Sequence, residues 1–346
     1  GHTTGSRNIA IGYGAMDGTA ADDAPTSTDN IFIGYDAGGG SWDDGADSTD
    51  DSNFNIGIGN YALDGALDGA LNNIAIGYNA LTAATTTKQS TAIGVNACQS
   101  VTTGTHNFGI GYNAVATVAG GGYQMGIGAY ALQHASATGN GTNIAIGYAA
   151  GRYVSTSTRN VFMGYQAGMS ASGTKLTGTA NTGIGTYALN TVQGAGNSNT
   201  AVGDQALGQL TTGADNVAIG RNAGYSMTAN TNSILIGNYA GDAINSADAI
   251  GTVAIGYAAG GGITSGQGNT AVGFSALLTE DDGDFSTAIG YQALTAQTGT
   301  TGTVGNTAVG YQSGVAITTA IATTAIGHSA LSSCTTAGGN TVVGYD

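Results

Sequence analysis

Proline, basic side chains and long apolar runs are all scarce in this sequence. Its 346 residues include one proline, two cysteines and six lysine or arginine residues. The near absence of proline excludes collagen and argues against a proline-rich linker, and so few cations argue against a nucleic-acid-binding surface. No run of about 18 apolar residues occurs, so we expect no membrane span in this segment.

Charge of either sign is sparse, and what there is gives an acidic balance. Only 8% of the residues are charged and the formal net charge is −15, while 41% are hydrophobic. A disordered acidic tail would need more charge and less hydrophobicity. The 62 glycines, together with many alanine, threonine, serine and asparagine residues, instead suit a closely stacked backbone.

A short motif recurs along the whole chain, written NIAIGYNAL at residues 73–81 and NTAVGYQSG at residues 306–314. Its glycine occurs 19 times, and ten of the 18 intervals between successive motif glycines are 17 residues long. A fixed period of this kind predicts a solenoid rather than separate globular domains. We therefore expect one continuous repeat array over residues 1–346, with its longest inserted turn at residues 38–53.

The residue types around the motif glycine predict strands. An isoleucine, valine or methionine precedes the glycine in every copy, an asparagine usually lies four residues before it, and an alanine follows three residues after it. The apolar run is too short for an isolated helix, and β-branched residues beside a glycine favour a strand with a bend. Coils stacked about 4.8 Å apart would form parallel sheets, so we expect an all-β roll of about 19 coils.

Each position of the repeat that recurs from copy to copy suggests a structural role. We expect the aliphatic residue before the glycine to stack on its copies as an apolar spine inside the coil, and the asparagines to form a ladder of amides. The glycine supplies a bend or a close backbone approach. The small residues beside this spine would let another chain pack closely, so we expect a closed homo-oligomer, with a homotrimer preferred.

The repeats NIAIG, NTAVG and STAIG resemble the head repeats of YadA-like trimeric autotransporter adhesins and of related phage-type fibres. The resemblance covers essentially the whole chain and implies a left-handed parallel β-roll, a homotrimer, and a location outside the cell or on a virion. A tyrosine directly after the glycine is typical of the fibre-type sequences, so the fibre branch is preferred. Since the chain opens inside one copy and stops inside another, we expect a fragment of a longer fibre protein.

Acidic residues gather in two turns. The inserted turn holds the only tryptophan, Trp42, and a cluster of five aspartates, and a second cluster lies at residues 279–285. Crowded carboxylates can bind Ca²⁺, although neither turn has the spacing of a known calcium loop, and a solvated loop remains the alternative. The calcium candidates are Asp43, Asp44, Asp47, Asp50 and Asp51. Trp42, at the tip of the insertion, is the candidate surface contact residue.

The remaining chemically active residues do not form a recognisable set. The two cysteines, Cys98 and Cys334, occupy different slots and are interpreted as small apolar fillers, with an intermolecular disulfide as the alternative. Four scattered histidines lack the spacing of metal ligands. The column of tyrosines after the glycine is either a structural aromatic ladder or a strip on which sugars stack.

These observations predict a structural protein and no enzyme, with no catalytic or cofactor-binding residue. The preferred function is a stiff fibre or adhesin segment, extracellular or on a virion tail fibre, that mediates attachment to a surface glycan or host receptor. The alternatives are a glycan- or ice-binding β-solenoid, which would need a flat and regularly spaced face, and a β-helical polysaccharide lyase or hydrolase, which would need clustered acids and bases.

Overall fold

Each part of the chain that can be placed consists of short strands and turns. The computed structural model describes residues 5–19, 26–40, 42, 51–135, 141–299 and 301–345. The longest inserted turn, residues 38–53, therefore lies largely outside the described residues. The chain divides into two compact units, Gly1–Thr177 and Gly178–Asp346.

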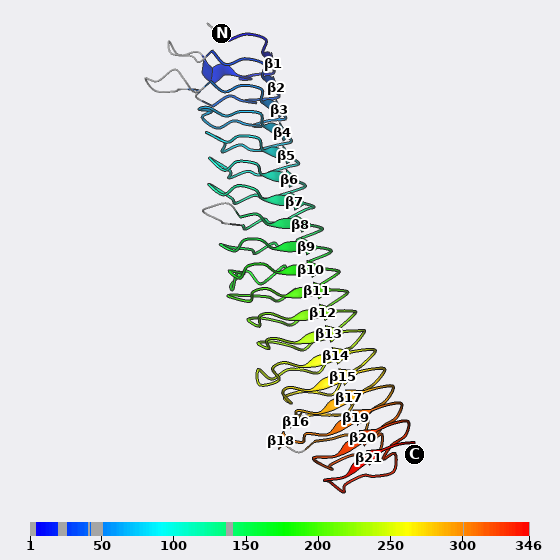
Figure 1. The fold of residues 1–346 in the computed structure, drawn as a ribbon. Coiled ribbons are helices and arrows are strands. Elements are labelled where there is room, and N and C mark those ends of the chain that lie inside the picture. Colours follow the sequence, from blue (N-terminus) through cyan, green and yellow to red (C-terminus); the bar gives the residue numbers. More distant parts are fainter. Residues whose placement is uncertain are drawn as a thin grey trace. The chain divides into compact units, whose positions relative to one another are not determined.

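The first unit contains nine strands of three residues, and successive strands from β1 to β9 pair in parallel (Figure 1). A short 3-10 turn, η1 (Asp17–Thr19), follows the first strand. The strands are β1 (Ile9–Ile11), β2 (Ile31–Ile33), β3 (Ile56–Ile58), β4 (Ile74–Ile76), β5 (Thr91–Ile93), β6 (Phe108–Ile110), β7 (Met125–Ile127), β8 (Ile144–Ile146) and β9 (Val161–Met163).

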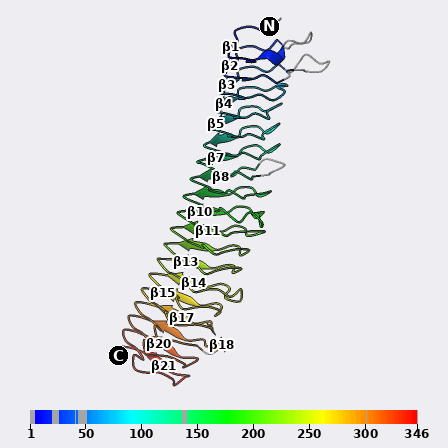
Figure 2. The same cartoon turned by 180° about the vertical axis from the view of Figure 1, so that it is seen from behind.

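The second unit repeats this arrangement with ten three-residue strands, also paired in parallel with their successors. These strands are β10 (Thr182–Ile184), β11 (Thr200–Val202), β12 (Val217–Ile219), β13 (Ile234–Ile236), β14 (Val253–Ile255), β15 (Thr270–Val272), β17 (Thr287–Ile289), β19 (Thr307–Val309), β20 (Thr324–Ile326) and β21 (Thr341–Val343). Two shorter strands, β16 (Gly283–Asp284) and β18 (Gly302–Thr303), pair in the turns. Figure 2 shows β18 from the opposite side.

Each unit is thus an all-β parallel solenoid with a period of about 17 residues, and the two units together have nineteen three-residue strands. Each strand coincides with one copy of the motif, and the described residues include no α-helix. Nor do they include any helical segment long and apolar enough to cross a membrane. The prediction of stacked coils with parallel strands is confirmed. Length variation falls in the turns, so that even the 25-residue interval between β2 and β3 leaves Ile31 opposite Ile56.

The motif glycine allows successive coils to approach closely. At Gly77 the backbone φ is +137°, and a Cβ atom there would lie 2.5 Å from the carbonyl oxygen of Gly94 in the next coil. No side chain fits at that distance, and L residues rarely adopt this φ. The glycine column therefore forms a backbone-to-backbone contact that a larger residue would prevent, as the sequence predicted.

Buried asparagines link the coils through their side-chain amides. Asn73 Nδ2 donates to Asn55 Oδ1 at 3.0 Å and to the carbonyl oxygen of Thr87 at 2.7 Å. In the second unit, Asn216 Nδ2 donates to Asn199 Oδ1, also at 3.0 Å. These bonds satisfy polar groups that would otherwise be buried without partners, and they confirm the predicted amide ladder.

The core of each coil is built mainly from small side chains. The middle residue of the strand points inward, and Ala75, Ala201 and Ala271 are fully buried there. The alanine three residues after the motif glycine, such as Ala80, is also fully buried. The seventh residue after that glycine supplies larger groups, including Val101, Leu210, Met227, Ile244, Ile263 and Ile317.

This burial pattern corrects the predicted position of the apolar spine. The aliphatic residue before the glycine points outward, and Ile76 and Ile219 are 37% and 40% exposed. Side chains alternate between the two faces of a strand, so the inward alanine forces both of its neighbours to the outside. The small residues expected at an outer packing surface are instead the ones that fill the narrow interior.

Candidate functional site

The outward face of the short parallel sheet in each unit is a regular surface, with equivalent residues of successive strands in register. The first and third residues of every strand point outward, and register pairing places each on its copies, as with Ile219 opposite Ile236. The third residue is isoleucine, valine or methionine throughout. Contiguous exposed apolar patches of this kind are typical of interaction surfaces.

Aromatic rings form a second column beside the aliphatic ones. In the first unit, Tyr148 stacks on Tyr165 with ring centroids 5.3 Å apart, and edge contacts join Tyr112, Tyr130 and Tyr148. In the second unit the rings of Tyr257, Phe274, Tyr291, Tyr311, His328 and Tyr345 stack in sequence at 4.9–5.3 Å. The structural ladder predicted from the tyrosine column is therefore present.

Stacking limits what the long run of the ladder can bind. Rings such as Tyr291 and Tyr311 lie nearly parallel, with 8° between their planes, so each covers a face of the next. A sugar would need an open ring face, and the space between centroids 5.3 Å apart cannot admit one. These residues expose their edges and hydroxyl groups, since both rings are more than two-fifths exposed.

Trp42 does not occupy the surface position predicted for it. Its side chain is 1% exposed, its ring meets Phe32 edge-on at 5.6 Å, and its Nε1 donates to the carbonyl oxygen of Gly38 at 2.9 Å. The large ring of tryptophan suits a core position of this kind, because its single polar atom has a hydrogen-bond partner there. Trp42 is thus a core residue, which corrects its assignment as a surface contact.

The calcium candidates are only partly visible. Asp51 accepts a hydrogen bond at 2.7 Å from the hydroxyl of Thr26, while Asp43, Asp44, Asp47 and Asp50 lie outside the described residues. Among the residues that are described, no cluster of three or more histidine, cysteine or acidic side chains has the geometry to hold a metal ion.

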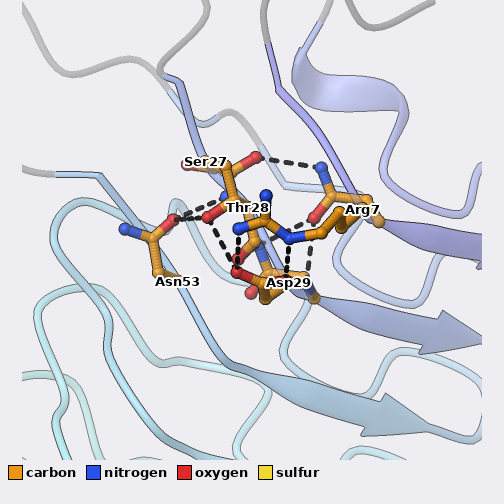
Figure 3. A network of polar contacts seen from close by, with 7 residues as sticks. Arg7, Ser27, Thr28, Asp29 and Asn53 are labelled. Carbon is orange, nitrogen blue, oxygen red and sulfur yellow. Dashed lines mark hydrogen bonds and ion pairs between the residues drawn. The ribbon is translucent and has the colours of Figure 1, made fainter.

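A polar network caps the start of the first unit (Figure 3). Arg7 donates through Nε and Nη2 to the two carboxylate oxygens of Asp29, at 2.6 and 2.7 Å. This hydrogen bonding lowers the pKa of the Asp29 carboxyl below its ordinary value. Asn53 accepts from the backbone N–H of Thr28 at 2.6 Å. The network ties neighbouring coils together and offers no reactive group.

The second acidic turn contains a buried structural carboxylate. Glu280 lies in the column occupied by Met227, Ile244 and Ile263 in earlier coils, and it is fully buried. Its Oε1 accepts from the backbone N–H groups of Asp281, Gly283 and Gly299 at 3.1, 2.8 and 2.9 Å. The side-chain amide of Gln297 donates to its other oxygen. These partners account for the carboxylate without a metal ion.

The cysteines and histidines also have structural surroundings. Cys98 is fully buried, and burial raises the pKa of its thiol to about 12. Cys334 is half-buried, and both thiols are free. His106 and His134 stack on Tyr123 and Tyr153 at 4.7 and 5.1 Å, so these histidines form aromatic pairs outside the tyrosine ladder.

Two hollows in the second unit were not predicted. Each is centred on a glycine five residues after the motif glycine, Gly208 in one and Gly261 in the other, and their volumes are about 350 and 440 Å³. The coils before and after carry side chains in this slot, so the missing side chain leaves a space. The sequence signal was a glycine at this slot between two larger residues. Besides Gly208, the first hollow is lined by Tyr187, Asn190, Thr191, Gln205, Gln209 and Tyr225.

The fold and its surface features define the chain as a parallel β-solenoid repeat protein. No family model matches the chain, and no curated protein matches it in sequence.

Proposed function

We propose that the chain is a segment of a stiff attachment fibre, a left-handed β-roll that assembles with two further copies of itself through the outward face of its sheet. The observation that supports this most strongly is the in-register column of exposed aliphatic side chains, of which Ile76, Ile219 and Ile289 are examples at 37–40% exposure. Burying such a column against another copy would remove apolar surface from water at every coil.

The thin core also favours association. Alanine fills most inward strand positions, and these side chains bury little apolar area, which at about 25 cal/mol per Å² yields modest stabilisation for each coil. Three chains packed along one axis would add a shared core. Because each chain has a net charge of −15, association should strengthen as added salt screens the repulsion.

The role in attachment follows from the same features. Successive coils present aromatic edges and turns at their surface, and we place the fibre outside the cell, on a cell surface or on a virion. Its partner would be a surface glycan or a host receptor.

Light scattering coupled to size exclusion tests the assembly. We expect a mass near three chains of 33.7 kDa each. The variant Ile219→Lys places a charge in the proposed interface and should shift the protein toward the monomer. Thr212→Lys is the matched control, since Thr212 is exposed in a turn of the same coil outside the strand. A monomeric wild-type protein, or equal masses for both variants, would contradict the proposal.

An ice-binding surface is the second candidate, and one observation favours it. The first residue of each of the last five three-residue strands is a threonine, and pairing places these residues in register: Thr270, Thr287, Thr307, Thr324 and Thr341. The third residue of each of these strands is aliphatic. The surface therefore has one row of threonines and lacks the two threonines per coil that a Thr-x-Thr ice-binding face would have. Inhibition of ice recrystallisation by wild-type protein and its loss in Thr307→Lys would favour this function over the fibre.

A further inference from the structure

We propose that the hollow around Gly208 binds one unit of a neutral sugar chain. The inference rests on the proposed role in attachment and names the chemical class of the partner. The hollow lies within the second unit, and its volume of about 350 Å³ is at the lower end of the range of about 300–1,000 Å³ that is common for ligand pockets.

The shape of the hollow comes from the absence of a side chain at Gly208. A Cβ atom there would lie 3.1 Å from both Cδ2 and Cε2 of Tyr225 in the next coil, so the tyrosine ring leans over the glycine. Asn190 occupies the same slot in the preceding coil. The space is therefore bounded on one side by an aromatic ring and on the other by an amide.

The polar groups around the hollow are neutral and are able to bond hydroxyl groups. Asn190 Oδ1 is buried and has no hydrogen-bond partner among the described residues, which is costly unless a donor fills the site. The hydroxyl of Thr191 donates to the carbonyl oxygen of Gly208 at 3.0 Å, and its oxygen can still accept. The amides of Gln205 and Gln209 supply both donors and acceptors.

This combination selects for a sugar over other ligands. A sugar ring presents C–H groups that pack on an aromatic face and hydroxyl groups that bond amides. No charged side chain lines the hollow, and the net charge of −15 disfavours anionic glycans. The hollow around Gly261 provides an internal contrast, because Asp242 and Leu278 there occupy the slots that Asn190 and Tyr225 occupy around Gly208.

The test begins with an array of oligosaccharides probed with the labelled full chain. The array should contain neutral glycans that end in glucose, galactose, mannose or N-acetylglucosamine, with sialylated and sulfated glycans as charged comparators. We expect binding to neutral glycans only. Calorimetric titration with the strongest neutral ligand then measures its affinity.

Variants locate the site. Tyr225→Ala and Gln209→Ala should each weaken binding, Tyr225→Ala by about tenfold, since an aromatic packing contact has roughly that effect on affinity. Gly208→Ala places a methyl group 3.1 Å from the Tyr225 ring without removing a polar group, so it narrows the hollow and should also weaken binding. Tyr311→Ala and Gln193→Ala are matched controls, because neither residue lines the hollow, and they should bind as wild type does. Circular dichroism verifies that each variant retains its β structure.

Binding of charged glycans alone, or of none, would overturn the inference, as would unchanged affinity in folded Tyr225→Ala and Gln209→Ala. The oligomer measurement is independent of this result. A trimer that binds no sugar would refute the sugar site but not the fibre assembly. A monomer that binds sugar through Tyr225 would refute the fibre assembly but not the sugar site.

Discussion

A Cβ atom on Gly168 would lie 2.2 Å from Cδ1 of Phe162, so the phenylalanine ring fills the space that a side chain at residue 168 would need. Phe32 is related to Gly38 in the same way, with a corresponding distance of 2.7 Å. Several other coils place a small residue in the strand and a leucine in the later slot, as with Ala201 and Leu207. The two slots therefore share one volume, as expected of a close-packed interior.

This shared volume predicts compensation between the two positions. Phe162→Ala should lower the free energy of unfolding by about 3–5 kcal/mol, because it leaves a cavity. Adding Gly168→Leu should restore part of this loss, since leucine occupies the equivalent slot at Leu189 and Leu207 with φ near +50°. Urea unfolding of the two single variants and the double variant gives the coupling energy. Simple addition of the two losses would contradict the shared volume.

The glycine column should tolerate no side chain. Gly77→Ala combines an unfavourable φ with the close contact to the next coil, and we expect a loss of about 3 kcal/mol or more. Gly173→Ala is the matched control, because no atom lies within 4 Å of its Cβ position, and it should change stability by less than about 0.5 kcal/mol. Thermal unfolding followed by circular dichroism measures both, and equal melting temperatures would disprove the steric role.

The amide ladder should stabilise the fold, because each asparagine forms hydrogen bonds with the coils before and after it. Asn199 donates to Asn181 Oδ1 and to the carbonyl oxygen of Gly213, and it accepts from Asn216. Asn199→Leu leaves these groups buried without partners, at about 1–3 kcal/mol each. The exposed Asn245→Ala serves as the control. Denaturant unfolding should separate the two variants clearly, and a neutral Asn199→Leu would show that the ladder is dispensable.

The two thiols should differ in reactivity. Cys98 is fully buried whereas Cys334 is half-buried, and only the exposed thiolate reacts readily. Native protein should therefore react with a disulfide reagent at one thiol per chain, and unfolded protein at two. Rapid modification of both in the native state would contradict the buried position of Cys98.

Burial of Cys98 also predicts an alkaline loss of stability. Its pKa is raised to about 12 from 9.0, so the unfolded state loses this proton first. The contribution of the protonated Cys98 thiol to the free energy of unfolding is present in full below about pH 9. Above pH 9 this contribution falls by roughly 1.4 kcal/mol per pH unit. Under reducing conditions, wild type should lose stability faster than Cys98→Ala between pH 9 and 10.5. Parallel curves would refute the shift, since the two proteins differ only at residue 98.

The sequence was sufficient to predict the coils, the strands and the asparagine ladder, because each depends on a period and on residue types at fixed slots. It did not predict which side of the strand faces inward. Hydrophobicity alone favours burying Ile76 rather than Ala75, but Leu81 is fully buried in the same coil and leaves room for only an alanine at this strand position. The choice is decided by interior volume, which the motif does not express.

The surface features were predicted less well for a related reason. Trp42 was expected at the surface because it falls in an insertion, but an edge contact with Phe32 holds it in the core. The hollow around Gly208 depends on what the coils before and after place in one slot. A feature of three consecutive coils is not visible in any single copy of the motif.

Because equivalent slots meet from coil to coil, the length of such a chain can change without a new design of its interior. Removing residues 204–220, for example, would join Gly203 to Arg221 and bring the same slots together again. Duplication would do the opposite, and each step would alter the reach of the protein by one strand spacing of about 4.8 Å. Selection on reach could thus act by gain or loss of whole repeats.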